Sequence, residues 1–218
     1  MAAALRIDFV SDVACPWCVI GLRSLLVALK ALEGAVDAEI VLQPFELNPD
    51  MGPEGENVTE HVQKKYGSTR EQSNAAREAI RNSGAAFGFV FRYGDDSRIW
   101  NTFDAHRLLH WARLEGKQLG LKEALFRANF TDQSPISDRR VLVGAAAAAG
   151  LDAARAEEVL VSGAFAEEVR REEAVWRERG IHAVPSIVLD QRWMIQGAQP
   201  PEVFERAIRD RIAAPSGP

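Results

Sequence analysis

Two cysteines separated by two residues stand between a predicted strand and a predicted helix, in "FVSDVACPWCVIGL". Residues 5–13 alternate apolar and polar side chains, which is typical of a buried strand. Residues 19–32 follow the motif and carry leucines at helical spacing, and Gly34 is placed to end that helix. A second strand is predicted over residues 38–47. Strand, helix and strand together predict a βαβ unit, in which Cys15 and Cys18 lie at the first turn of the helix.

The remaining chain is predicted to be helical until close to its end. Residues 48–179 carry helix signals and almost no strand signals, with Ser68 or Thr69 as one good cap. Residues 185–197 then predict a hairpin that turns at Asp190 and Gln191. A terminal helix follows, and residues 213–218 are expected to fray. The predicted class is α/β, with one domain made of residues 1–47 plus 181–218 and an inserted helical subdomain over 48–180.

Composition limits the classes of partner and the compartment. The 218 residues are 47% hydrophobic and carry a formal charge of −5, with no block of like charge that would indicate a nucleic-acid arm or a membrane patch. No apolar run reaches the length of a membrane span. The apolar start of the chain is interrupted by Arg6 and Asp8, unlike a secretory signal. We therefore expect a cytoplasmic protein that binds neither nucleic acid nor membrane.

The spacing and context of Cys15 and Cys18 predict redox chemistry. Backbone N–H groups and the positive end of the dipole at a helix start favour the Cys15 thiolate. Cys18 follows one turn later on the same face, within bridging range. Pro16 occupies a position where a missing N–H costs nothing. We predict that Cys15 is the exposed attacking thiol and that Cys18 is the more buried resolving thiol of a mixed disulfide.

Other interpretations of the pair are weaker. A zinc site needs roughly four ligands, and the chain offers two thiols and four scattered histidines, so no metal is expected. His106 and His110 have a spacing that can hold a metal, but a satisfied interdomain pair or two surface histidines is the favoured interpretation. A structural disulfide is disfavoured because two cysteines in a reducing compartment do not make a scaffold. Trp17 between the cysteines is either a substrate-facing aromatic or a packing residue.

Four segments resemble the DsbA-like thioredoxin-fold oxidoreductases, specifically the FrnE-like branch: "DFVSDVACPWCVIGL", "IWNTFDAHRLLHWA", "GIHAVPSIVL" and "IQGAQPPEVFERAI". The resemblance covers nearly the whole chain and implies a thioredoxin-like fold with a large all-helical insertion. It also implies that Pro185 is cis and faces the cysteine motif, with Val184 able to pair with the backbone of a bound substrate. From sequence alone, an ordinary trans proline at a strand edge would be the expected form.

The same architecture is found in 2-hydroxychromene-2-carboxylate isomerases and kappa-class glutathione transferases. The present chain resembles them in Asn101 and Arg107, which are placed near the cleft in those enzymes. Those enzymes typically carry serine at the position of Cys15 and use glutathione as a cofactor. Cys15 with Cys18 departs from that pattern and indicates a dithiol enzyme. No tightly bound cofactor is expected beyond the Cys15–Cys18 disulfide itself, and glutathione remains an open co-substrate.

Accessory positions have two interpretations each. His182 would help to hold the thiolate if the Pro185 turn faces the cysteines, or it is a solvent-facing histidine. Asn101, Asp104 and Arg107 are either cleft residues or helix-cap and packing residues. The alternating aromatics of "FGFVFRYG" form either a lip of a binding cleft or, as we favour, covered core.

Three functions are compatible with these residues. The first is a thiol:disulfide oxidoreductase acting on a thiol- or disulfide-containing protein, peptide or low-molecular-weight thiol. The second is a glutathione-dependent isomerase or transferase for a small aromatic or polyketide-like substrate. The third is a redox-sensing interaction protein. Both a monomer and a homodimer are compatible with the sequence, which does not fix the substrate or the direction of electron flow.

Overall fold

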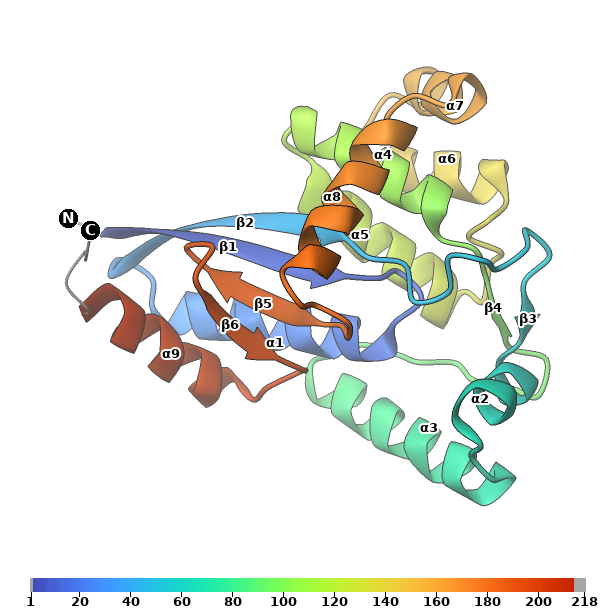
Figure 1. The fold of residues 1–218 in the computed structure, drawn as a ribbon, viewed down its shortest axis with the longest axis horizontal. Helices are drawn as coiled ribbons and strands as arrows, with labels where there is room; N and C mark the ends of the chain where they lie inside the picture. Colours follow the sequence, from blue (N-terminus) through green and yellow to red (C-terminus); the bar gives the residue numbers. More distant parts are fainter. Residues whose placement is uncertain (1, 214–218) are drawn as a thin grey trace.

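The computed structural model describes residues 2–213, so the tail expected to fray lies almost entirely outside the described residues. Its central sheet has four strands in the order β2-β1-β5-β6 (Figure 1). β1 and β2 run parallel, while β5 and β6 add antiparallel neighbours on the other side of β1. The bounds of the four strands are β1 Ala3–Ser11, β2 Val36–Pro44, β5 Ser186–Leu189 and β6 Trp193–Gln196.

Helices α1 (Pro16–Ala31) and α9 (Pro201–Ala213) pack against each other beneath the sheet (Figure 1). The predicted hairpin is confirmed, and its turn residues Asp190 and Gln191 take positive φ angles of 45° and 59°. The βαβ start, the hairpin and the terminal helix together make the thioredoxin-like α/β fold that the sequence predicts.

The segment between β2 and β5 is mainly helical, as predicted. Thr69 starts one helix with a reciprocal capping box to Gln72, and Asp138 and Asp152 cap two others. The helices are α2 Val58–Tyr66, α3 Arg70–Ala86, α4 Phe103–Leu114, α5 Gln118–Phe126, a π-helical turn Arg127–Thr131, α6 Arg139–Ala148, α7 Ala153–Ser162 and α8 Ala166–Glu178.

One pairing in this segment differs from the all-helical expectation. β3 (Glu56–Asn57) and β4 (Arg98–Ile99) form an antiparallel ladder of two residues per strand. A ladder this short has no alternating pattern to read from sequence, because its register depends on the loops that bring it together. The insertion is therefore helical apart from this small clasp.

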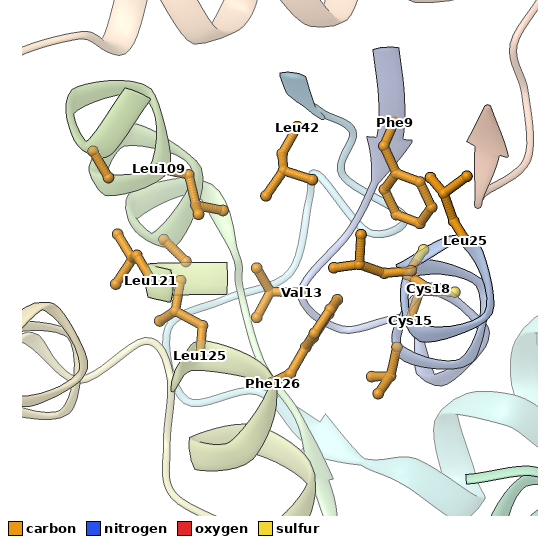
Figure 2. Packing of buried hydrophobic residues seen from close by; sticks show 14 of the residues in the cluster. Phe9, Val13, Cys15, Cys18, Leu25, Leu42, Leu109, Leu121, Leu125 and Phe126 are labelled. Atoms are coloured by element: carbon orange, nitrogen blue, oxygen red, sulfur yellow. The ribbon is translucent and has the colours of Figure 1, made fainter. Parts of the chain in front are cut away.

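The insertion and the sheet share one hydrophobic core. Figure 2 shows Val13 and Phe126 packed between α5 and the start of α1. The Gln118 side chain on α5 bonds both backbone groups of Leu42, donating to its carbonyl at 2.8 Å and accepting from its N–H at 2.9 Å. α5 thus covers part of the free edge of β2. The division of the chain at residues 47 and 181 stays a prediction. No helix within residues 2–213 is both long and apolar enough to cross a bilayer.

Candidate active site

Cys15 occupies the N-cap position of α1, with φ −95° and ψ 113°, and Pro16 is the first helical residue. Its backbone N–H donates to Asp12 O at 3.2 Å, and its carbonyl accepts from the Cys18 N–H at 3.1 Å. Both thiols are free, and Figure 2 shows the two sulfurs close together at the start of the helix. The proline stiffens this turn at no hydrogen-bonding cost, as expected at a first helical position.

The accessibility of the two thiols follows the predicted order but not the predicted degree. Cys18 is fully buried, and Cys15 is only 4% exposed, so the expectation of an exposed Cys15 is wrong. The cause is the loop before β5, because the Cys15 Sγ donates to the Val184 carbonyl at 3.6 Å and lies under it. Burial, followed by the hydrogen bond and charge of Cys15, raises the pKa of Cys18 well above its ordinary value.

The loop before β5 is held against α1 by several contacts. The Val184–Pro185 peptide bond is cis, and the Pro185 carbonyl accepts from the Gly197 N–H at 2.9 Å. Gly21 in α1 faces this proline so closely that a Cβ there would lie 3.0 Å from Pro185 Cγ. Glycine at this position thus lets the Pro185 loop pack closely on α1, and a larger side chain would press against Pro185.

Asp12 anchors the turn that carries Cys15, a role that the sequence analysis missed. Its side chain is buried and accepts from the backbone N–H groups of Ala14 at 3.2 Å and Leu47 at 2.8 Å. Its Oδ1 also lies 3.3 Å from His106 Nε2 on α4. Burial alone would raise the pKa of Asp12. The hydrogen bond and charge of His106, together with the hydrogen bonds from Leu47 and Thr102, outweigh burial and hold that pKa below its ordinary value.

Lys122 is a second missed residue, and it reaches the site from the insertion. Its side chain on α5 is 1% exposed, and its Nζ lies 5.1 Å from the centroid of the Phe126 ring. Burial lowers the pKa of Lys122 to about 8, although the negative charges of Cys18, Asp12 and Cys15 act in the opposite direction. Lys122 is thus a buried cation whose field favours the ionised form of Cys18.

The remaining predicted residues fall at different distances from the motif. Trp17 is 41% exposed, on the surface beside Cys15. His182 is also exposed, and within residues 2–213 it makes no hydrogen bond to either cysteine. Asn101 donates to Met51 O at 2.9 Å and accepts from the Phe103 N–H at 2.9 Å. These bonds agree with the interpretation of Asn101 as a helix-cap residue rather than a cleft residue.

Arg107 is buried, and all its hydrogen-bond partners belong to the helical insertion. Its guanidinium contacts Asp104 at 2.6 Å and donates to Ala164 O at 2.8 Å and to the Val159 carbonyl. These partners place Arg107 in the connection between α7 and α8, in agreement with the packing alternative. His110 contacts Glu172 at 3.3 Å in the same region. Among residues 2–213, no three histidine, cysteine or acidic side chains are grouped as metal ligands.

Comparison with known proteins agrees with this geometry. A family model for the DsbA-like thioredoxin domain matches residues 6–209. A probable DsbA oxidoreductase from Streptomyces coelicolor is 36% identical, with 98% of this chain and 92% of that chain covered and a TM-score of 0.91. No curated protein sequence matches the chain.

More distant solved structures share the fold. A 2-hydroxychromene-2-carboxylate isomerase is 14% identical, with 94% of this chain and 95% of that chain covered and a TM-score of 0.69. The cytosolic disulfide reductase DsbM from Pseudomonas aeruginosa, solved with GSH, is 15% identical, with 96% and 100% covered and a TM-score of 0.64. The resemblance noted from the sequence is confirmed: the chain belongs to the DsbA-like thioredoxin domain family.

Proposed function

We propose that the protein is a thiol:disulfide oxidoreductase that works through Cys15 and Cys18. The observation that carries the proposal is the position of Cys15, which occupies the N-cap position of α1 and contacts the Val184 carbonyl at 3.6 Å, with a second thiol one turn further along. The free N–H groups and the positive end of the helix dipole lie at the start of α1, beside Cys15, and such helix starts favour negative charge. The exposed Trp17 and the half-buried Val184 offer the surface on which a partner chain would lie.

The reaction is a pair of thiol–disulfide exchanges. The Cys15 thiolate attacks a partner disulfide, so that one partner sulfur leaves as a thiolate and the other becomes bonded to Cys15. Cys18 then loses its proton and attacks Cys15 Sγ, releasing the second partner sulfur. The partner is reduced by two electrons and the protein carries a Cys15–Cys18 disulfide. The reverse sequence oxidises a dithiol partner.

Lys122 supports the second exchange. The buried Cys18 ionises with difficulty, and the Lys122 cation lowers the cost of forming its thiolate. We assign Lys122 as a positioning residue for charge rather than as a group that touches the partner. The proposal includes a thiol- or disulfide-containing protein, peptide or small thiol as substrate, glutathione among them, and a cytoplasmic location, as the cysteine usage favours.

Trapping the mixed disulfide tests this proposal. Cys18→Ser should accumulate a partner covalently bonded to Cys15, detected by intact mass, because the resolving thiol is absent. Cys15→Ser is the matched control and should trap nothing. Catalytic turnover that persists in Cys18→Ser would instead favour the glutathione-dependent isomerase or transferase, whose chemistry needs no resolving thiol. Reversible oxidation of the pair without turnover of any disulfide would favour a redox-sensing protein.

A further inference from the structure

A pocket adjoins the cysteine motif, although Cys15 itself does not line it. This pocket of about 190 Å³ lies between the cysteine motif and the helices α2 and α3. Its rim on the motif side is formed by Ala14 and Pro16, the two neighbours of Cys15 in the chain. Neither Val184 nor Trp17 lines it. The pocket is therefore separate from the surface on which a partner backbone would pair.

The walls of this pocket suit a flat apolar group. Tyr93 lies parallel to Phe91 with the ring centroids 6.0 Å apart, and Phe130 meets Tyr93 edge-on at 6.5 Å. Aromatic walls of this kind favour an aromatic occupant through stacking and edge contacts. The apolar lining consists mainly of Val58, Val62, Tyr66, Ile80, Ile99 and Phe130.

Charge at the pocket is one-sided, although the whole chain carries −5. Among the described residues, those that line the pocket include Arg77, Arg98 and His61 but no aspartate or glutamate. His61 is already bonded to Glu56 at 2.7 Å. Neither arginine makes an ion pair with any carboxylate in residues 2–213. The Arg77 guanidinium donates to the Thr59 hydroxyl at 2.6 Å and lies 5.9 Å from the centroid of the Tyr93 ring. Arg77 is thus a half-buried cation available to an anion.

A buried hydroxyl on the same wall lacks a partner. Ser73 on α3 is 5% exposed, and its Oγ has no hydrogen-bond partner within the described chain. An unsatisfied buried polar group is costly, and a ligand that bonds it removes that cost. Ser73 lies one helical turn before Arg77, so the two residues share a face of α3, and both line the pocket.

The pocket lies next to the Cys15 backbone, because Ala14 and Pro16 line it on either side of that residue in the sequence. Burial raises the pKa of Tyr93 above its ordinary value, and the negative charge of Cys15 raises it further. The pKa of Tyr66 is raised by the same two causes in the same order. Tyr66 and Tyr93, which both line the pocket, thus respond to the charge of Cys15.

We propose that this pocket binds a low-molecular-weight aromatic thiol or disulfide that bears a carboxylate, with its ring against Tyr93 and Phe130, its carboxylate at Arg77 and its sulfur at Cys15. The assignment rests on the proposed function, whose substrate class it narrows. The volume of about 190 Å³ is below the roughly 300–1,000 Å³ of pockets for larger ligands, so it holds a single-ring body.

The exchange with such a disulfide is balanced. The Cys15 thiolate attacks one sulfur, the aromatic S–S bond breaks and the first aryl thiolate leaves. Cys18 then attacks Cys15 Sγ and displaces the second aryl thiolate. The aromatic disulfide gains two electrons, and the protein gains the Cys15–Cys18 bond.

The first exchange can be followed directly in the Cys18→Ser protein. The probes are 5,5′-dithiobis(2-nitrobenzoate), an aromatic disulfide with carboxylates, and 4,4′-dithiodipyridine, which has none. We expect a saturable rate with the carboxylate probe. Arg77→Gln should slow that probe about tenfold, the effect of losing one charge-assisted hydrogen bond, and leave dithiodipyridine within about twofold.

Arg81→Gln is the matched control. Arg81 lies one turn further along α3, and its guanidinium is 5.9 Å from the Tyr93 ring, as is that of Arg77, but it does not line the pocket. Its loss should leave both rates unchanged. If both arginine variants slowed the carboxylate probe equally, the effect would come from general charge attraction. That result would overturn the assignment of the carboxylate to Arg77.

A blocking variant tests the pocket without removing charge. Ala76 lines the pocket from an exposed position, so Ala76→Trp should fill it while preserving the fold. Both aromatic probes should slow, and 2-hydroxyethyl disulfide, which needs no pocket, should react as before. Rates that no variant alters would overturn the pocket assignment alone. A Cys15 that reacts with none of the three probes would overturn the proposed function itself.

Discussion

Asp12 and His106 are 94 residues apart in the sequence, and their side chains meet in the interior with Oδ1 and Nε2 3.3 Å apart. Asp12 belongs to the turn that presents Cys15, while His106 belongs to α4 of the insertion. The insertion therefore holds the cysteine motif in place through a buried polar pair as well as through apolar packing.

Replacing the Asp12 carboxylate should lower the free energy of unfolding. Asp12→Asn weakens the interactions with the Leu47 N–H and with His106, and losing one partner of a buried pair costs about 3 kcal/mol. Urea unfolding at neutral pH measures the change. Glu158→Gln is a control, because Glu158 and its partner Arg155 are both exposed, and the free energy of unfolding should change by less than about 1 kcal/mol.

The same pair predicts a dependence on acid. The pKa of Asp12 is lowered in the folded state from an ordinary value of 3.8, so its contribution to stability is complete above that value. The contribution is lost as the pH falls through the lowered folded pKa. The stability difference between wild type and Asp12→Asn should have its full value at about pH 5 and shrink below about pH 4. A difference that stays constant down to about pH 2 would contradict the assigned shift.

Lys122 predicts the same direction of change, with stability rising with pH, at the basic end of the range. Its pKa of about 8 in the folded state lies below the ordinary value of 10.5, so the unfolded chain binds more protons between these values and stability rises with pH. Lys122→Met removes the buried charge and should be more stable than wild type at pH 7 by up to about 3 kcal/mol. Its advantage should narrow as the pH rises from about 8 towards 10. An advantage that is absent at pH 7 would contradict the lowered pKa.

Gly21 and Gly144 make a matched pair of helical glycines. A Cβ at Gly21 would lie 3.0 Å from Pro185 Cγ, whereas a Cβ at Gly144 meets nothing within 4 Å. Gly144→Ala should stabilise the protein by about 0.5–1 kcal/mol through helix propensity. Gly21→Ala should instead destabilise it by about 1 kcal/mol or more and slow disulfide exchange, because the Pro185 loop must move away from Cys15. Thermal unfolding and turnover of a model disulfide check both variants.

The parts of the fold that depend on local patterns could be predicted from the sequence. The strand before Cys15, the helix after it and the hairpin turning at Asp190 were readable because alternation, helical spacing and turn residues are properties of neighbouring positions. The thioredoxin-like fold followed from these elements and from the family resemblance.

The parts that depend on distant contacts could not. Lys122 occupies an ordinary amphipathic helix, "LKEALFRANF", and only the packing of α5 on β2 buries its amine near Cys18. In the sequence Asp12 has the features of an ordinary turn residue, and only the folding of the insertion brings His106 next to it. The burial of Cys15 was missed for the same reason, because the Val184 loop that covers it comes from the far end of the chain.

The most direct test is the redox equilibrium of Cys15 and Cys18 in glutathione buffers of graded potential, with acid quenching, alkylation and intact mass. We predict a reversible two-electron transition in the wild type, within the roughly −120 to −270 mV range of dedicated thiol–disulfide enzymes. Cys15→Ser and Cys18→Ser should show no such transition. A wild-type protein that keeps both thiols reduced at every potential in that range would contradict the account.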